Sequence, residues 1–183
     1  MERLEGNIIL CGFMGSGKTS VGKRLAKKTG RVFCDTDRYL EKKSGMTVSQ
    51  IFAEYGEARF REMEAQAVRE LSGRSNMVIA CGGGTVLQSG NVKAFRAGGG
   101  KILFLDVPLA ALQERLKSDQ KRPLLQKPNR REVIKKLYRE RIGRYRRAAD
   151  IRINAGAPTV VVVKRIIAKL GLSAEAEKKG GNS

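Results

Sequence analysis

The sequence contains one continuous motif whose residues suit phosphate chemistry, Gly12-Phe-Met-Gly-Ser-Gly17-Lys18-Thr19. It matches the pattern G-x-x-x-x-G-K-[ST] in full. Glycines allow consecutive backbone N–H groups to face one phosphate, the lysine reaches the β and γ oxygens, and the threonine binds Mg²⁺. The motif therefore predicts a nucleotide-binding loop. The residues expected to contact the nucleotide there are Gly15, Ser16, Gly17, Lys18, Thr19 and Ser20.

A dinucleotide-binding loop is the rival interpretation of these glycines, with an acid twenty residues after Gly15 at Asp35. That pattern requires a third glycine at position 20, where this chain has Ser20, and it gives the Lys18-Thr19 pair no purpose. The phosphate-loop interpretation is therefore favoured.

Two acids, Asp35 and Asp37, follow the second predicted strand. In a parallel α/β sheet, ligands bind beyond the carboxyl ends of the strands, so these acids should face the same crevice as the phosphate loop. One carboxylate can hold Mg²⁺, and the other can orient or deprotonate an attacking hydroxyl. The alternative is that Asp37 only caps the next helix.

A third candidate element, Gly82-Gly83-Gly84, also follows a predicted strand directly. Three glycines leave bare backbone, which allows close approach of a ligand and offers N–H donors to a hydroxyl or a phosphate. A simple turn is the alternative. The position of the glycine triplet at a strand end favours a role in binding.

Arginines complete the candidate site. Arg61 follows Phe60, and Arg146 follows Tyr145, so each lies at the edge of an apolar helical stripe. A guanidinium at such an edge can lean into a cleft and bind a carboxylate through two parallel hydrogen bonds. A polar stretch with two prolines, at about 116–129, predicts a mobile lid that carries Arg122. The alternative for each arginine is a solvated surface side chain with no role in binding.

Composition limits the chemistry. The chain has 183 residues and no histidine, which excludes Ser-His-Asp and Cys-His catalysis and every histidine-liganded metal site. Its 37 Lys and Arg outnumber 18 Asp and Glu, giving a net charge of +19. This surplus predicts an anionic partner: nucleic acid, a membrane surface or a phosphorylated small molecule. Fifteen of the basic residues and only four acids lie within 115–152, which favours a field focused on small, highly charged ligands.

Short apolar runs alternate with amphipathic stretches along the whole chain, which predicts an α/β fold with a parallel sheet covered on both faces. A Thr-x-x-Gln pattern at Thr47 and an Asn129–Glu132 pair predict two helix starts, and Pro108 suits the first turn of a third helix. Thr159 to Leu170 fits a strand or a helix, and the alternation favours the helix. The predicted strands are Asn7 to Cys11, Val32 to Cys34, Met77 to Cys81, Lys101 to Leu105 and Ile151 to Ile153.

These residues together resemble the shikimate kinase family of small P-loop kinases, from about Asn7 to Leu170. The resemblance is carried by GFMGSGKT, DTD, IFAEYGEARFREME, the glycine triplet, RPLL and RERIGRYRRAAD, in the order of the family. It implies a single three-layer α/β/α kinase domain at 1–172, a central five-stranded parallel sheet and a mobile lid, with 173–183 a disordered tail. One departure is Ala80-Cys81, where members often have a hydroxyl residue just before the triplet.

The resemblance also assigns roles. Lys18 and Thr19 would bind ATP phosphates and Mg²⁺, and Asp35 would assist the metal. Asp37, Gly83 and Gly84 would hold substrate hydroxyls, while Arg61 and Arg146 would clamp a carboxylate. Arg115 would lie against the adenine. The implied catalytic residues are Lys18, Asp37 and Arg122.

The implied reaction is in-line transfer of the ATP γ-phosphoryl group to the 3-hydroxyl of shikimate, with ATP and Mg²⁺ required. A kinase for another small hydroxy acid, such as gluconate, is the nearest alternative. A nucleic-acid-binding ATPase is a third, disfavoured because aromatic residues that could stack on bases make up only 5 % of the chain.

The chain is expected to be a cytoplasmic monomer with no nucleic-acid or membrane partner. Its three cysteines, Cys11, Cys34 and Cys81, are far apart and are expected to be small buried residues in a reducing compartment. No apolar run approaches the roughly 20 residues that span a bilayer, and the first predicted strand leaves no room for a signal peptide.

Overall fold

The computed structural model describes residues 6–117, 119 and 128–173. Five parallel strands form one sheet in the order β2-β3-β1-β4-β5. Their bounds are Ile8–Cys11 (β1), Val32–Asp35 (β2), Met77–Ala80 (β3), Lys101–Asp106 (β4) and Ile151–Asn154 (β5). Every predicted strand is confirmed within one residue at either end, and the predicted α/β fold with a five-stranded parallel sheet is also confirmed.

Burial follows strand position. β1 and β3 are buried along their whole length, as is β4 beyond its first residue, because both faces of these strands are covered. The edge strand β2 leaves Val32 62 % exposed. In this chain, a continuous apolar run therefore indicates a strand. The more completely a strand is buried, the nearer it lies to the centre of the sheet.

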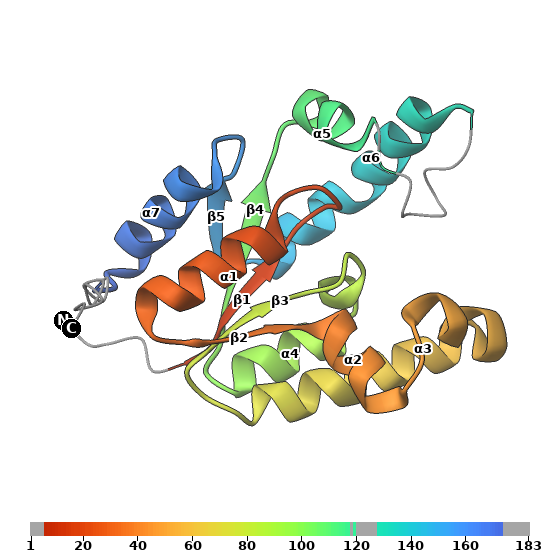
Figure 1. The fold of residues 1–183 in the computed structure, drawn as a ribbon, viewed down its shortest axis with the longest axis horizontal. Coiled ribbons are helices and arrows are strands. Elements are labelled where there is room, and N and C mark those ends of the chain that lie inside the picture. The colour runs from red at the N-terminus through yellow and green to blue at the C-terminus, as the bar shows by residue number, and fades with distance from the viewer. Residues whose placement is uncertain (1–5, 118, 120–127, 174–183) are drawn as a thin grey trace, which may run out of the picture.

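Helices cover both faces of the sheet. Figure 1 shows α1 in front of the strands and α6 behind them. α1 also contacts α7, while α4 packs on α3 and β4. The helices are Lys18–Thr29 (α1), Thr36–Ser44 (α2), Val48–Ser72 (α3), Ser89–Ala97 (α4), Leu109–Leu116 (α5), Arg130–Ala148 (α6) and Thr159–Leu170 (α7), with a 3-10 turn at Thr85–Leu87 (η1).

The predicted helix starts are confirmed. Thr47 accepts a hydrogen bond from the Gln50 backbone, and the Gln50 side chain accepts one from the Thr47 backbone, which is the expected capping box of α3. Asn129 precedes α6 as expected, although its side chain makes no capping hydrogen bond. The ambiguous stretch Thr159–Leu170 is α7.

One break lies inside α3. Gly56 has φ 77° and ψ 176°, a conformation outside the helical region that residues with a Cβ rarely adopt. A Cβ built at this position would meet nothing within 4 Å. The break is therefore a matter of backbone conformation alone, and it separates a short N-terminal arm of α3 from the longer part that carries Arg61.

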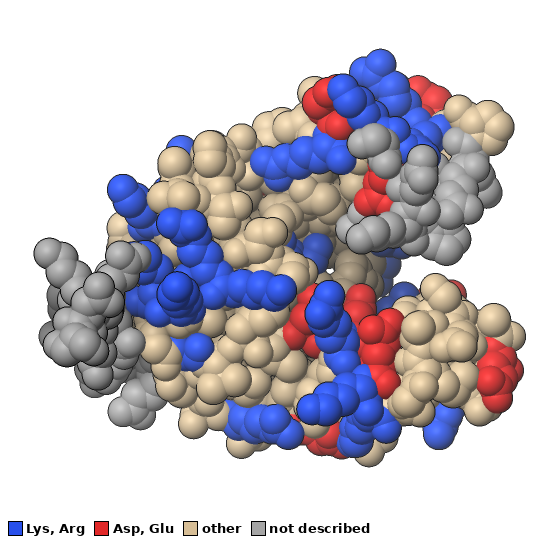
Figure 2. Space-filling model, in the orientation of Figure 1, with Lys and Arg blue, Asp and Glu red and all other residues tan. Residues whose placement is uncertain are grey.

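The strand order fixes where the candidate residues meet. The phosphate loop follows β1, Asp35 ends β2, and the glycine triplet follows β3, which lies between β1 and β2. Because the strands are parallel, all three segments leave the sheet at the same edge. Figure 2 shows a hollow on this face between the α5 region and the α2–α3 region, bordered by basic and acidic side chains.

Candidate active site

The phosphate loop connects β1 to the first residue of α1. Gly12, Gly15 and Gly17 have φ values of 150°, 77° and 90°, so the curvature of the loop depends on glycine. The Lys18 ammonium lies over the loop and donates to the carbonyls of Gly12 (2.9 Å) and Phe13 (3.1 Å).

The start of α1 is suited to an anion. No side chain caps it, and its first turn contains no acidic residue. Ser16 Oγ is buried and has no hydrogen-bond partner in the part of the chain that the structure describes. Unsatisfied donors at a helix N-terminus beside a lysine fit the phosphates of a nucleotide.

Thr19 and Asp35 meet beside this loop. Thr19 Oγ1 donates to Asp35 Oδ2 at 3.1 Å, and Asp35 Oδ1 accepts from the backbone N–H groups of Asp37 (3.1 Å) and Arg38 (3.3 Å). Among the residues described, no group of three or more acidic or cysteine side chains could hold a metal. A hydroxyl next to one carboxylate nevertheless fits Mg²⁺, which is held in kinases by one or two protein oxygens together with phosphates and water.

The capping interpretation of Asp37 is wrong. Asp35 caps α2 through the two backbone contacts above, while Asp37 lies in the first turn of the helix. Burial, with smaller contributions from the charges of Asp35 and Glu64, raises the pKa of Asp37 to about 6, although Lys18 opposes the shift. The Asp37 side chain is therefore not used for helix capping, and it is half-buried near two other acids, Asp35 and Glu64.

The glycine triplet lies against two of the candidate substrate-binding side chains, Asp37 and Arg61. A Cβ at Gly82 would stand 2.5 Å from Asp37 Oδ1, and one at Gly84 would stand 2.6 Å from Arg61 Nη1. Only residues without side chains allow these approaches. The triplet therefore brings bare backbone next to a carboxylate and a guanidinium.

A buried carboxylate holds Arg61 in place. Arg61 Nη1 donates to Glu64 Oε2 at 2.8 Å, and Glu64 Oε1 accepts from Thr85 Oγ1 at 2.7 Å, so Glu64 joins α3 to η1. Glu64 is 2 % exposed, whereas Glu57, the second partner of Arg61, is a surface residue. Glu64 is not among the residues predicted from the sequence. Its position one turn after Arg61 was the signal that could have indicated it as a partner of Arg61.

On α6 the structure brings Arg141 to the triplet. Arg141 Nη1 lies 3.7 Å from a Cβ built at Gly83, and the Tyr145 hydroxyl, one turn later, donates to the Gly83 carbonyl at 2.6 Å. Burial raises the pKa of Tyr145 to about 12, so its hydroxyl stays a donor, although the Arg141 charge opposes the shift. Arg141 is not among the site residues predicted from the sequence.

Arg146, the other candidate arginine of α6, lies near Asp106. Its guanidinium lies 4.0 Å from Asp106 Oδ2 at the end of β4, and its side chain is 51 % exposed. Arg152 also pairs with this Asp106 oxygen. The two arginines, 141 and 146, lie five residues apart on α6, so they project about 140° apart around the helix.

Arg115 joins two loops at the nucleotide end of the site. It donates to the Gly15 carbonyl of the phosphate loop (3.1 Å) and to the Ala155 carbonyl after β5 (3.3 Å). Arg115 therefore lies beside the loop that is predicted to hold the phosphates. Arg122 and most of the predicted lid, with the tail from 174, lie outside the described residues.

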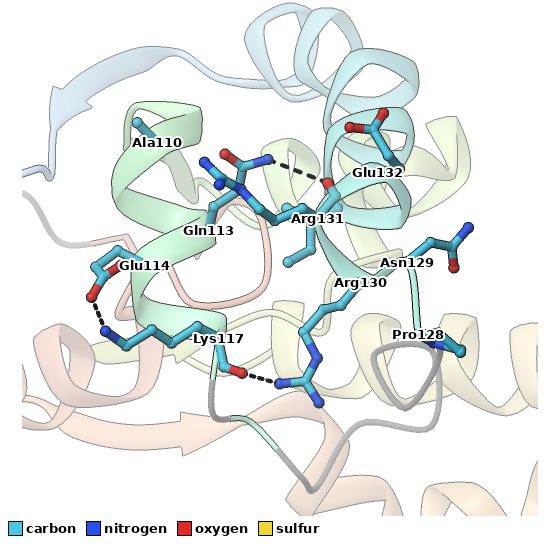
Figure 3. A pocket seen from close by; sticks show the side chains of 10 residues that line it. Ala110, Gln113, Glu114, Lys117, Pro128, Asn129, Arg130, Arg131 and Glu132 are labelled. Carbon is cyan, nitrogen blue, oxygen red and sulfur yellow. Dashed lines mark hydrogen bonds and ion pairs between the residues drawn. The ribbon is translucent and has the colours of Figure 1, made fainter.

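One cavity in the described chain lies apart from these residues. Figure 3 shows the side chains that line it between α5 and α6. Its volume is about 610 Å³. Gln113 donates across it to the Arg131 carbonyl. Its lining contains none of the predicted site residues, so the candidate site is defined by the strand ends and not by cavity size.

Comparisons with known proteins agree with this arrangement. The family model described as shikimate kinase matches residues 14–171. A shikimate kinase of Pelotomaculum thermopropionicum is 46 % identical over 82 % of this chain and 87 % of its own length. One from Chromobacterium violaceum is 40 % identical over 93 % and 92 %.

Solved structures agree as well. Shikimate kinase from Acinetobacter baumannii, in complex with shikimate, is 35 % identical, with a TM-score of 0.82 over 91 % of this chain and 94 % of that one. A gluconokinase from Sinorhizobium meliloti is 19 % identical with a TM-score of 0.58, covering 93 % and 94 %, which shows a shared fold alone.

A five-stranded parallel sheet with a phosphate loop after its central strand defines this chain as a P-loop kinase in fold. Within that class, it belongs to the shikimate kinase family. No helix in the described ranges is long and apolar enough to cross a membrane.

Proposed function

We propose that the protein transfers the γ-phosphoryl group of ATP to the 3-hydroxyl of shikimate. The observation that carries the proposal is the convergence of Asp37, Arg61 and Arg141 on one glycine triplet, beside a phosphate loop. A carboxylate and two guanidinium groups suit an acceptor that has hydroxyls and a carboxylate. Family membership supports the same acceptor.

In this proposal, Asp37 accepts a hydrogen bond from the attacking hydroxyl and orients it. The hydroxyl oxygen forms a bond to the γ-phosphorus as the bond from that phosphorus to the leaving oxygen of ADP breaks, and the hydroxyl proton passes to Asp37 or to water. Lys18 would neutralise charge on the phosphates, with Arg122 closing over them from the lid. Thr19 and Asp35 would hold Mg²⁺, which supplies further charge neutralisation.

Arg61 and Arg141 would bind the acceptor carboxylate, with Glu64 holding Arg61 in orientation. The contacts of Arg146 support a place at Asp106 in preference to a carboxylate clamp. Arg115 would lie against the adenine. We further propose that the enzyme acts as a cytoplasmic monomer, with its domain at 1–172 and with no nucleic-acid or membrane partner.

A coupled assay of ADP formation tests the acceptor. With ATP and Mg²⁺, shikimate is expected to support turnover at least a hundredfold faster than gluconate or no acceptor, because family membership favours shikimate over other hydroxy acids that also have a carboxylate. Phosphorus NMR of the product checks that a phosphate ester forms. Equal or faster turnover with gluconate would refute the proposal, as would ADP release that needs no acceptor.

A Gly84→Ala substitution tests the geometry of the carboxylate clamp. Its Cβ would stand 2.6 and 2.7 Å from the two Arg61 terminal nitrogens, so the flexible guanidinium must move. We expect the KM for shikimate to rise about tenfold or more, with kcat and the melting temperature little changed, because one charge-assisted contact is displaced.

Gly90→Ala is the matched control for this change. Gly90 lies in α4, and its Cβ would meet nothing within 4 Å. The KM for shikimate, measured by steady-state kinetics, should be clearly higher in Gly84→Ala than in the control. Similar KM values for the two variants would contradict the assigned place of Arg61.

A further inference from the structure

A second cavity lies beside the η1 turn that follows the glycine triplet. It has a volume of about 280 Å³, is open to solvent, and is lined by residues of η1, α4 and the C-terminal half of α6. Four of its lining residues are basic, Lys93, Arg96, Arg144 and Arg147, and none is acidic. The reaction proposed above uses none of these residues.

Two of the four cations are held by the fold. Arg144 donates to the Leu87 carbonyl at 2.7 Å. Arg96 donates to the Ala148 carbonyl at 3.1 Å and to Asp150 Oδ1 at 2.9 Å. Asp150 is the only acidic partner in this set, and its other oxygen accepts from the Ile102 backbone at 2.8 Å. The guanidinium groups are thus positioned before any ligand arrives.

The other two cations, Lys93 and Arg147, are exposed and have no hydrogen bond or ion pair within the described part of the chain. Arg144 has no carboxylate partner there either. Three uncompensated cations around one concave surface repel each other and focus positive potential into it, which a multivalent anion would relieve.

The size and lining of the cavity narrow the class of ligand. Its volume is at the low end for small-molecule sites, which suits a phosphate ester or a diphosphate better than a nucleotide. Arginines bind phosphate oxygens through paired, planar hydrogen bonds. The buried side chains of Val86 and Val92 also line it and offer a small apolar surface.

We propose that this cavity is a binding site for a small multivalent oxyanion of the phosphate-ester or diphosphate class, separate from the catalytic site. It adjoins the catalytic site through shared elements. Arg144 holds η1, which follows the triplet, and Tyr145 of the same helix donates to the Gly83 carbonyl. An anion bound there would contact the α6 and η1 segments that lie next to the triplet.

Calorimetric titration with inorganic pyrophosphate, at physiological salt and with EDTA present, tests the site. Pyrophosphate is also expected at the phosphate loop, so the wild-type protein should show two sites. Lys18→Ala should retain the cavity site. A Lys93→Ala/Arg147→Ala double variant should lose it, with an affinity at least tenfold weaker, and should retain binding at the loop.

Lys164→Ala/Arg165→Ala is the matched control, because it removes the same charge from the surface of α7. It should keep both sites. Methyl NMR of Val86 and Val92 gives a second readout, since pyrophosphate should shift both signals in Lys18→Ala. If the double variant fails to fold, Lys93→Gln alone should weaken binding severalfold.

Three results would overturn the proposal. The first is a single site in wild-type protein that Lys18→Ala abolishes. The second is equal loss of affinity in the double variant and in its α7 control, which would indicate nonspecific charge attraction. The third is tight binding of a single-stranded oligonucleotide at Lys93 and Arg147 with no binding of pyrophosphate, which would make the cavity part of a nucleic-acid surface.

Discussion

Replacing Asp37 by Asn is expected to lower kcat by about 10²–10⁴ while leaving the fold intact. An amide has nearly the same shape as a carboxylate but cannot accept the proton of the attacking hydroxyl, and its NH₂ group would turn a donor toward that hydroxyl. The KM for ATP should change little, because the phosphate loop is not altered. Steady-state kinetics with shikimate and ATP provide the measurement.

A Glu62→Gln variant is the matched control for Asp37→Asn. Glu62 is an exposed acid of α3, paired only with Arg59 on the surface. Its loss should leave kcat within twofold of the wild-type value. Near-normal turnover of Asp37→Asn would remove this residue from the mechanism.

The same Asp37 variant should be the more stable protein at neutral pH in metal-free buffer. The pKa of Asp37 is raised from 3.8 to about 6 by burial and acidic neighbours, so the folded state binds the proton more tightly than the unfolded state does. The free energy of unfolding therefore falls as pH rises through this interval. Asn does not ionise and avoids that loss.

We expect Asp37→Asn to gain about 1–3 kcal/mol at pH 7 and much less below pH 4. For a domain of this size, each kcal/mol corresponds to about 2–4 °C in melting temperature. Melting curves of both proteins across this pH range, in EDTA, measure the difference. A gain that does not depend on pH would show that ionisation of Asp37 is not its cause.

Arg141→Ala is expected to raise the KM for shikimate by about 30- to 1,000-fold. Loss of a partly buried guanidinium that pairs with a carboxylate typically costs about 2–4 kcal/mol, and each 1.4 kcal/mol is a factor of ten. The reason for choosing Arg141 is its contact with the glycine triplet, 3.7 Å from a Cβ at Gly83.

Arg146→Ala provides the comparison on the same helix. This variant loses an exposed arginine 4.0 Å from Asp106, and its KM should change less than threefold. Both variants are compared by steady-state kinetics and by melting temperature. A large KM effect in Arg146→Ala and none in Arg141→Ala would instead support Arg146, the residue predicted from the sequence, as the one that binds the carboxylate.

The strands and the phosphate loop could be predicted because their signals are local. Ile8 to Cys11 is a short apolar run, and the loop after it has a fixed pattern of glycines, lysine and threonine. Parallel topology then follows from the alternation of strands and helices. The strand order explains why the loop, Asp35 and the triplet meet at one edge.

The clamp arginine could not be chosen from sequence in the same way. Arg141 and Arg146 both flank the apolar stripe of α6, and helical periodicity gives the angle between them but not which side faces the triplet. That choice is made by the packing of α6 against η1 and β4. Glu64 was not predicted for a related reason: its hydrogen bond from Thr85 of η1 joins residues far apart in the sequence, which the pattern of α3 alone does not show.

Asp35 and Asp37 illustrate a further limit. Both acids are near the start of α2, and either could be the capping residue in a sequence pattern. The exact residue at which β2 ends decides between them. A difference of two positions at this boundary separates the carboxylate that caps α2, which we propose to lie beside the metal, from the one that we propose to contact the acceptor.

In stereochemical terms, Gly56 is the point in α3 where the chain adopts a conformation typical of D-amino acids. Its φ and ψ, 77° and 176°, are close to the mirror image of an extended L-residue. Nothing within 4 Å of its absent Cβ forces this choice. The direction of the Val48–Tyr55 arm relative to the helix that carries Arg61 is therefore set by the one residue type without a stereocentre.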